Sequence, residues 1–173
     1  MLSSRGSLAA LIVVASLALS ACGFEPLHRG SSASSAAALA NVEIARIEDR
    51  AGQMLRNDLL SMMAPRGYVA SPEYRLEITL SESKREVLLE DTSFSTRADV
   101  IVTAQTKLIR QVDGEIVESG RVEAVSGYNI LSASQEYANV VSERNAREGA
   151  LKLVARDIVR QVSVWLRNAD SGA

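Results

Sequence analysis

The stretch that decides the fold is T-R-A-D-V-I-V-T-A-Q-T-K-L, residues 96–108, in which every second side chain is apolar or small. Successive side chains of a β-strand point to opposite faces, so a period of two indicates a strand with one buried face. The pattern therefore predicts a half-buried strand, and its buried face carries Ala98, Val100, Val102, Ala104, Thr106 and Leu108.

Similar alternation flanks this strand on both sides. Upstream, residues 74–80 read Y-R-L-E-I-T-L and predict a second half-buried strand, which the charged run Glu82–Glu86 is expected to interrupt. Downstream, Asp113-Gly114 is typical of a two-residue type I′ hairpin turn. A further strand is predicted over residues 115–129, with Gly120 marking a bulge because it has no side chain to pack.

Two amphipathic helices complete the pattern. Residues 48–67 hold apolar side chains at helical spacing, with Asp49 expected to cap the start, and Pro65 and Gly67 to end the helix. Ser132 and Gln135 form an S-x-x-Q capping box before a long helix that runs to about Arg167. Its apolar stripe consists of Leu151, Val154, Ile158, Val162 and Trp165.

A short strand over residues 41–47 precedes the first helix, so the predicted order is β-α-β-β-β-α. Sequential strands joined by short turns are antiparallel neighbours, and their common apolar face needs a cover. The predicted fold class is α+β, a two-layer sandwich with two helices packed on one face of a four-stranded, mainly antiparallel sheet. The other face, expected to meet solvent or a polar partner, carries Arg75, Glu77, Lys107, Arg121 and Glu123.

The N-terminal segment has the layout of a bacterial lipoprotein signal. Arg5 precedes an apolar run over residues 8–19, which is too short to span a bilayer but suits a secretory signal. Leu19-Ser20-Ala21-Cys22 then resembles a lipobox, in which the cysteine sulfur is lipidated and the chain is cut just before it. The alternative is an ordinary cleavage site beside an incidental thiol.

These features predict four regions along the chain. They are a lipoprotein signal peptide over 1–21, a lipidated N-terminus and flexible Ser/Ala-rich tether over 22–40, a folded α+β domain over 41–168, and a disordered tail over 169–173. The tether has one alternative, because residues 30–40 could also open an Ala-rich helix.

Composition argues against several classes of function. The formal net charge of −2 gives no electrostatic case for nucleic acid as a partner. One cysteine and one histidine supply no metal-ligand set and no disulfide, and no cofactor motif occurs. His28 lies in the predicted tether, where nothing holds it as a catalytic base, so the sequence predicts no enzyme.

Binding is the remaining class of function. Positive charges accumulate on and between the predicted strands, and solvated surface residues are their plain interpretation. A sharper interpretation is a set of cations for the phosphates of an anionic lipid, lipopolysaccharide. Those candidate residues are Lys84, Arg85, Arg97, Lys107 and Arg110.

Four fragments together resemble the LPS-assembly lipoprotein LptE family. They are C-G-F-E-P-L at 22–27, I-E-D-R-A-G-Q-M-L-R-N-D-L at 47–59, S-G-Y-N-I at 126–130 and E-R-N-A-R-E-G-A-L-K-L-V-A-R-D-I at 143–158. The resemblance implies two helices on a four-stranded sheet, with Cys22 as the lipidated residue.

The resemblance also implies a function. The chain would be an outer-membrane lipoprotein, held on the periplasmic side by N-terminal acyl chains. It would plug the lumen of the LptD β-barrel, help to assemble that barrel, and assist delivery of lipopolysaccharide to the cell surface. The alternative is another periplasm-facing lipoprotein that binds an envelope component.

Overall fold

The computed structural model describes residues 32–87, 96–131 and 135–171. Its contacts separate residues 1–33 from residues 34–173, and the fold below is that of the second unit. The elements in chain order are α2 (Ser32–Ala40), β1 (Val42–Ile44), α3 (Asp49–Met63), β2 (Tyr74–Val87), β3 (Thr96–Arg110), β4 (Ile116–Ile130) and α4 (Glu136–Ser171).

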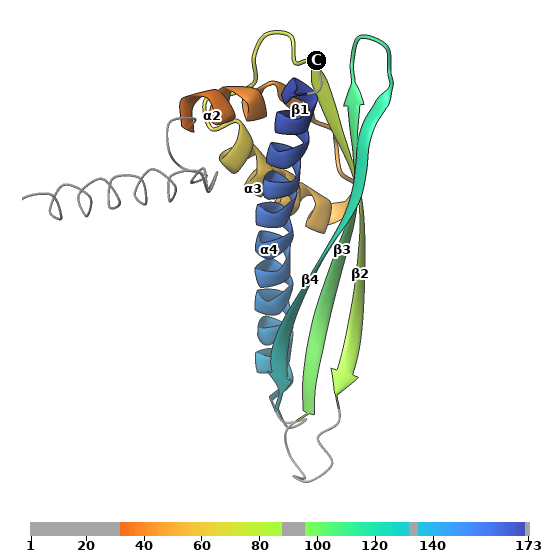
Figure 1. The fold of residues 1–173 in the computed structure, drawn as a ribbon. Helices are drawn as coiled ribbons and strands as arrows, with labels where there is room; N and C mark the ends of the chain where they lie inside the picture. The colour runs from red at the N-terminus through yellow and green to blue at the C-terminus, as the bar shows by residue number, and fades with distance from the viewer. Residues whose placement is uncertain (1–31, 88–95, 132–134, 172–173) are drawn as a thin grey trace, which may run out of the picture. The chain divides into compact units, whose positions relative to one another are not determined.

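The strands form one four-stranded sheet in the order β1-β2-β3-β4. Strand β1 pairs in parallel with β2 over three residues only, from Val42↔Tyr74 to Ile44↔Leu76. The pairs β2–β3 and β3–β4 are antiparallel and run almost the whole length of each strand. The α+β prediction is therefore confirmed, with one short helix, α2, added before β1 (Figure 1).

Strand β3 is the centre of the fold, as its alternation predicts. Its inward side chains from Ala98 to Leu108 are at most 3% exposed, and α4 packs against both β3 and β4. Figure 1 shows α4 running along the long strands, with β4 beside it and β2 on the far side. The predicted stripe of α4 is buried in this interface: Leu151, Val154, Ile158, Val162 and Trp165.

Strand β2 differs from its prediction at the charged run. It continues without a break from Tyr74 to Val87, so Glu82–Glu86 does not interrupt it. The even-numbered residues keep the inward orientation of Leu76 and Ile78. Helix α4 supplies partners of opposite charge for Glu82 and Lys84, and Lys84 is the partner of Glu86. Charged residues that have partners of opposite sign can remain within a strand, whereas charged residues without partners would end it.

The β3–β4 connection also differs in detail. Five residues, 111–115, separate the two strands. The connection is closed by hydrogen bonds from the Arg110 N–H to the Glu115 carbonyl and from the Gly114 N–H to the Arg110 carbonyl, both 2.9 Å. Within this loop only Gly114 has a positive φ, of 72°, whereas a type I′ turn needs two such residues. Asp113-Gly114 thus marks the hairpin correctly, but the two-residue turn type was wrong.

The bulge lies at a different place from the predicted one. The register shifts between Leu108 and Ile109, where Val117 on β4 has no opposite residue. Gly120 pairs regularly with Thr106, and a Cβ at Gly120 would collide with Gln161 and Trp165 of α4. The absence of a side chain at Gly120 lets Gln161 and Trp165 lie close to the strand.

The ends of α3 agree in part with prediction. The helix ends at Met63 just before Pro65, as expected. At its start, Glu48 occupies the N-cap position without a side-chain capping bond, and Asp49 has a φ of 64°. The prediction that Asp49 caps the helix was therefore wrong.

The two ends of the described chain are more helical than predicted. Residues 32–40 form α2 in place of a flexible tether, which corresponds to the Ala-rich helix weighed as the alternative. Alanine has the highest helix propensity, and Leu39 buries its side chain in the core. Helix α4 continues to Ser171, three residues into the predicted tail, while Ser132 of the capping box lies outside the described residues.

Candidate functional site

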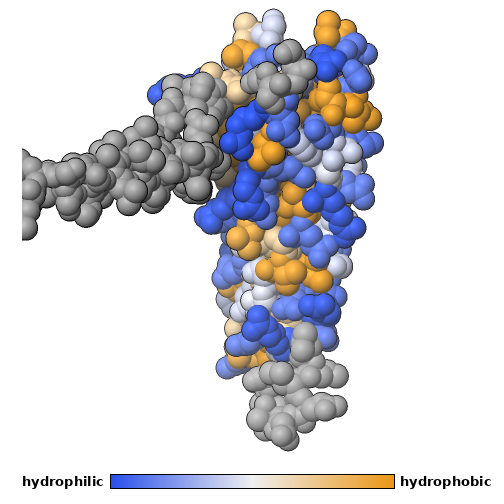
Figure 2. Space-filling view, viewed as in Figure 1, coloured by the Kyte–Doolittle hydropathy of each residue, from blue (hydrophilic) through white to orange (hydrophobic). Residues whose placement is uncertain are grey.

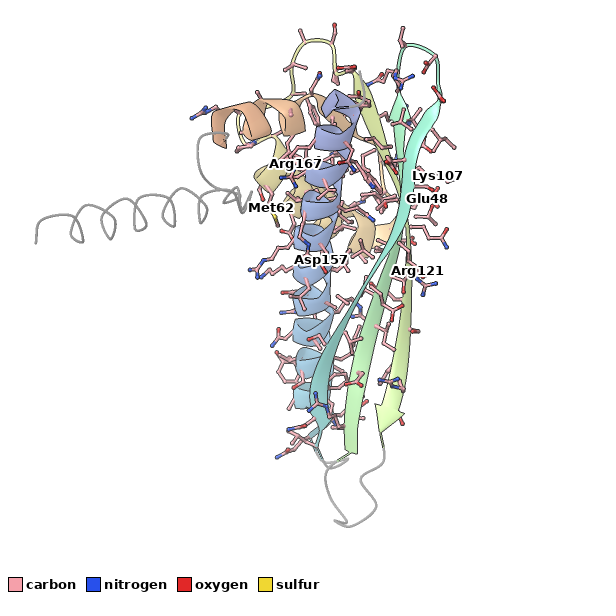
Figure 3. The ribbon with its side chains drawn as sticks, viewed as in Figure 1. Glu48, Met62, Lys107, Arg121, Asp157 and Arg167 are labelled. Carbon is pink, nitrogen blue, oxygen red and sulfur yellow. The ribbon has the colours of Figure 1, made fainter. Side chains whose placement is uncertain are left out.

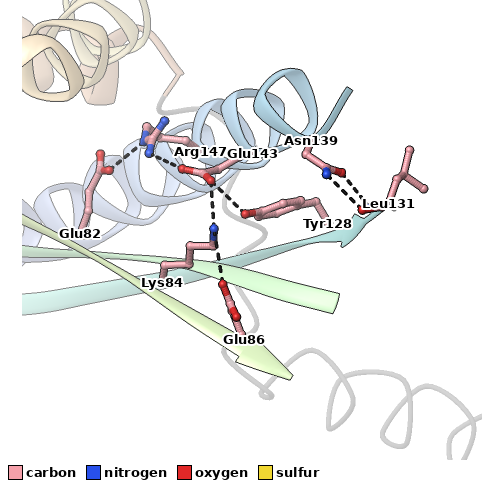
Figure 4. Close-up of polar contacts among 8 residues, drawn as sticks. All are labelled: Glu82, Lys84, Glu86, Tyr128, Leu131, Asn139, Glu143 and Arg147. Carbon is pink, nitrogen blue, oxygen red and sulfur yellow. Dashed lines mark hydrogen bonds and ion pairs between the residues drawn. The ribbon is translucent and has the colours of Figure 1, made fainter. Parts of the chain in front are cut away.

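Charged side chains connect β2 to the first half of α4. We call Glu82, Lys84, Tyr128, Glu143 and Arg147 the β2–α4 network (Figure 4). At its centre, Glu143 Oε2 accepts hydrogen bonds from Lys84 Nζ at 3.2 Å and from the Tyr128 hydroxyl at 3.0 Å. The network thus connects β2, β4 and α4 through the carboxylate of Glu143.

Arg147 extends the network along α4. Its guanidinium donates to Glu143 Oε1 at 3.1 Å and to Glu82 Oε2 at 2.8 Å. Lys84 Nζ lies 3.8 Å from a carboxylate oxygen of Glu86 and 5.7 Å from the centre of the Tyr128 ring. Each charge therefore has at least one partner of opposite sign, which makes the ion pairs mutually supporting.

The ionisation of these groups follows from the contacts. The Tyr128 hydroxyl and then the Glu143 carboxylate raise the pKa of Lys84 above its ordinary value. The Lys84 ammonium, followed by the Tyr128 hydroxyl, lowers the pKa of Glu143. Glu82 raises the pKa of Arg147. These shifts keep Lys84, Glu143 and Arg147 charged at neutral pH.

A side chain at the beginning of α4 also fixes the junction with β4. Asn139 Oδ1 accepts a hydrogen bond from the Leu131 N–H at 2.7 Å, and Asn139 Nδ2 donates to the Leu131 carbonyl at 3.1 Å (Figure 4). A side-chain amide thereby satisfies both backbone groups of one residue. This contact holds the end of the sheet against the helix that carries Glu143.

Two of the predicted cations meet on the opposite, uncovered face of the sheet. Arg85 and Arg97 lie 3.1 Å and 3.6 Å from the carboxylate of Asp99, whose side chain is only 12% exposed. A Cβ at Gly127, which pairs with Asp99 across the strands, would collide with the Arg97 guanidinium. The missing side chain at Gly127 therefore makes room for an Arg-Asp-Arg cluster with one excess positive charge.

The other predicted cations lie apart from that cluster. Lys84 belongs to the network on the inward face, and Arg110 bonds Asp113 and Glu115 in the hairpin, each at 2.9 Å. Lys107 has no hydrogen bond or ion pair among the described residues. Figure 3 shows Lys107 and Arg121 pointing away from α4. The five cations thus do not form a single site.

The face visible in Figure 2 has polar and apolar residues interspersed, with polar ones in the majority. On the open side of the sheet the prediction of a polar surface is confirmed, since all five expected residues there are exposed: Arg75, Glu77, Lys107, Arg121 and Glu123.

A groove of about 870 Å³ lies among β2, the start of α3 and the first half of α4. Its apolar lining includes Ile47, Met54, Ile78 and Leu80. Its charged lining contains five arginines and five acidic residues: Arg46, Arg50, Arg75, Arg144, Arg147, Glu48, Asp49, Glu77, Glu82 and Glu148. The groove is therefore close to neutral overall.

The sequence held a signal for the network that its interpretation missed. Glu82, Lys84 and Glu86 have the same parity as the buried Leu76 and Ile78, so a continuous strand would turn them toward the helices. No such signal exists for the groove, because it depends on where α3 leaves the sheet.

Other kinds of site find little support in the described part of the chain. Residues 32–87, 96–131 and 135–171 hold no group of three or more His, Cys, Asp or Glu that could bind a metal ion. In the same ranges, no helix is both long and apolar enough to cross a membrane. Cys22 lies outside the described residues, so its lipidation stays a prediction.

A comparison of the sequence with protein-family models and with curated proteins finds no match. Solved structures do match. A Caulobacter crescentus CB15 protein assigned as a lipoprotein is 24% identical with a TM-score of 0.59, over 78% of this chain and 97% of that chain. A minor lipoprotein from Acinetobacter baumannii is 16% identical with a TM-score of 0.53, over 71% and 90%.

A third structure, rare lipoprotein B from Shewanella oneidensis, is 10% identical with a TM-score of 0.53, over 75% of this chain and 98% of that chain. The three matches define the class of fold, a two-layer α+β fold that also occurs in bacterial lipoproteins. At these identities they establish the fold of this chain, while its activity is a matter for proposal.

Proposed function

We propose that the chain is an outer-membrane lipoprotein, anchored through Cys22, that plugs the LptD β-barrel, helps to assemble it and assists delivery of lipopolysaccharide. One observation carries the proposal: the fold matches rare lipoprotein B along 98% of that protein. The lipobox at residues 19–22 and the four fragments that resemble the LptE family support it independently.

The uncovered face of the sheet suits a partner with a polar surface. Its exposed residues carry both signs of charge, and ion pairs such as Arg75–Glu77 and Arg121–Glu123 lie along it. The interior of a large outer-membrane barrel is polar, since only its outer surface meets lipid. A domain with this largely polar face is suited to such a lumen.

The same face offers the better candidates for lipopolysaccharide phosphates. Arg85 and Arg97 share one carboxylate, so one positive charge is left over, and Lys107 has no partner among the described residues. Guanidinium groups bind phosphate through paired N–H donors. Lys84 and Arg110 are weaker candidates, because carboxylates already surround them.

The first experiment is co-purification from membranes. A tagged chain extracted in mild detergent should bring down LptD. A Cys22→Ala variant, expected to lose metabolic labelling by palmitate, is the matched control for the anchor. Failure of the lipidated chain to bring down any LptD would refute the proposal.

The second experiment separates the candidate cations. The double variant Arg85→Gln, Arg97→Gln should weaken lipopolysaccharide binding several-fold, and Lys84→Gln should leave it nearly unchanged. Binding is measured with purified chain and labelled lipopolysaccharide, and circular dichroism checks the fold. Equal binding by the double variant and the unmodified chain would remove both arginines as contacts.

The groove favours a second candidate function. A lipoprotein that binds an envelope component needs a cavity, and about 870 Å³ lies within the usual size range of ligand sites. A bound component would protect groove residues such as Met54 and Leu80 from chemical labelling in protein purified from cells. Unchanged labelling after the component is extracted would speak against this function.

A further inference from the structure

Strand β2 has a free edge along most of its length. Strand β1 pairs with Tyr74–Leu76 and then leaves the sheet. The Leu76 carbonyl accepts from the Ala45 N–H at 3.0 Å, so the backbone groups of even-numbered residues face the β1 side. In a regular strand this direction recurs every second residue. Beyond β1, the backbone groups of Ile78 and Leu80 therefore meet no partner among the described residues.

The groove runs beside this free edge. Ile78, Thr79 and Leu80 line it, with Ile47 and Met54 on the α3 side. Ile78 is nearly buried, and Leu80 is half-buried against the core. An extended chain that continues the position of β1 beside β2 would thus meet both the unpaired backbone groups and apolar side chains.

The free edge of β4 is not equivalent. The inward side chains of β4 are covered by α4, whose Gln161 and Trp165 side chains lie close to the Gly120 backbone. Along β2, by contrast, α4 contributes only the long side chains of Arg144, Arg147 and Glu148 to the groove. The inward side of the edge is therefore accessible at β2.

The part of the β2 edge from Glu82 to Glu86 is protected against pairing with another strand. Glu82, Lys84 and Glu86 point inward beside it, and inward charges are a common device against unwanted strand pairing. Residues 77–81 carry no inward charge, since Ile78 and Leu80 are the inward side chains there. The accessible segment is thus about 17 Å long at the usual rise per residue.

The charges of the groove indicate what kind of molecule fits. Its five arginines are balanced by five acidic residues, so an anionic headgroup gains no net attraction. A polypeptide backbone is neutral and satisfies the unpaired N–H and C=O groups of the edge. We propose that an extended segment of another polypeptide adds to β2 beside residues 77–81, as a strand in line with β1.

A second copy of this chain fits this edge poorly. Because β1 occupies the edge up to Leu76, two antiparallel β2 strands can overlap only over residues 77–87. The register of full overlap places Lys84 of one copy opposite Leu80 of the other, and Glu82 opposite Glu82. A shift of two residues pairs Lys84 with Glu82, but the overlap then covers only residues 79–87 and leaves Ile78 without a partner in β2. Charges against apolar residues and like charges face to face both destabilise a sheet. The occupant is therefore a different polypeptide with apolar residues at alternate positions.

Amide hydrogen exchange on the full-length chain in detergent micelles tests this inference. The probe is the capped peptide Thr-Val-Thr-Val-Thr-Val-Lys, and the control is the same peptide N-methylated at every residue, which blocks the edge-facing backbone in either strand direction. The probe should slow exchange of the Ile78 and Leu80 amides about tenfold, because backbone hydrogen bonds protect amides, and leave Lys84 unchanged. The N-methylated control should protect neither amide.

A matched pair of variants localises the effect. Leu80→Lys adds an inward charge at the edge and should abolish protection of Ile78, whereas Ser81→Lys points to the other face and should keep it. Circular dichroism shows whether each variant folds, and the result on the unmodified chain stands in either case.

Three results would overturn the inference. They are protection of neither amide by the probe, equal protection by the N-methylated peptide, and protection that rises with protein concentration when no peptide is present. The last result would assign the edge to a second copy. The inference goes beyond the proposed function, so loss of LptD co-purification would leave it standing.

Discussion

The interface between α4 and the sheet has two regions that are held by different physics. From Leu151 onward, α4 is held by apolar burial: Leu151, Val154 and Ile158 lie in the core and are at most 1% exposed. In its N-terminal half, Glu143 and Arg147 reach across to β2 through ion pairs whose side chains are about a third exposed.

The difference follows from geometry. Helix α4 lies over β4 and β3, so short apolar side chains suffice there, whereas β2 lies beyond their reach. Long charged side chains bridge the remaining distance, as Figure 4 shows for Glu82 and Lys84. The apolar region therefore carries most of the stability of the fold, and the β2–α4 network sets the position of β2.

The largest effect is expected in the apolar region. Ile158→Ala removes a side chain that is 0% exposed and leaves a cavity, so the free energy of unfolding should fall by about 2–5 kcal/mol. Leu153→Ala, at a position that is 43% exposed on the same helix, is the matched control and should change it by about 0.5 kcal/mol or less. Urea unfolding measures both, and equal losses would refute the division into two regions.

A smaller effect is expected in the network. Glu143→Gln removes the charge shared by Lys84 and Arg147, and the free energy of unfolding should fall by about 1 kcal/mol, because partly exposed ion pairs contribute little. The loss should shrink in high salt, which screens such pairs. Glu148→Gln, which breaks a single exposed pair with Arg144, is the control with a smaller loss.

The smallest expected effect is the pH dependence of the stability that Glu143→Gln loses. Because the folded protein lowers the pKa of Glu143 below its ordinary value of 4.5, the contribution is fully present above 4.5 and disappears as pH falls through the folded pKa. The stability gap between the unmodified chain and Glu143→Gln should therefore be constant from about pH 7 to about pH 5 and close in stronger acid. A gap that widens on acidification would contradict the role given to Glu143.

Local patterns predicted most of the fold. The alternation in residues 96–108 and the stripe from Leu151 to Trp165 fix which faces are buried, and each is a periodic signal within one element. The end of α3 before Pro65 is equally local. These predictions succeeded because the physics behind them involves only neighbouring residues.

The misses involve contacts between distant elements. The charged run at Glu82–Glu86 stays in a strand because Glu143 and Arg147, about 60 residues away, neutralise it. The bulge predicted at Gly120 was wrong, because the side chains that favour glycine there, Gln161 and Trp165, belong to the distant helix α4. Likewise, the candidate cations fall on both faces of the sheet, since strand parity places Lys84 and Arg85 on opposite sides.

The most direct test of the proposed function is depletion of the chain in a Gram-negative cell that depends on it. If the chain assembles the LptD barrel, depletion should reduce heat-modifiable, folded LptD in the outer membrane and then lower the lipopolysaccharide exposed at the cell surface. Restoring the unmodified chain should reverse both losses. Folded LptD and surface lipopolysaccharide that stay at normal levels after complete depletion would contradict the account.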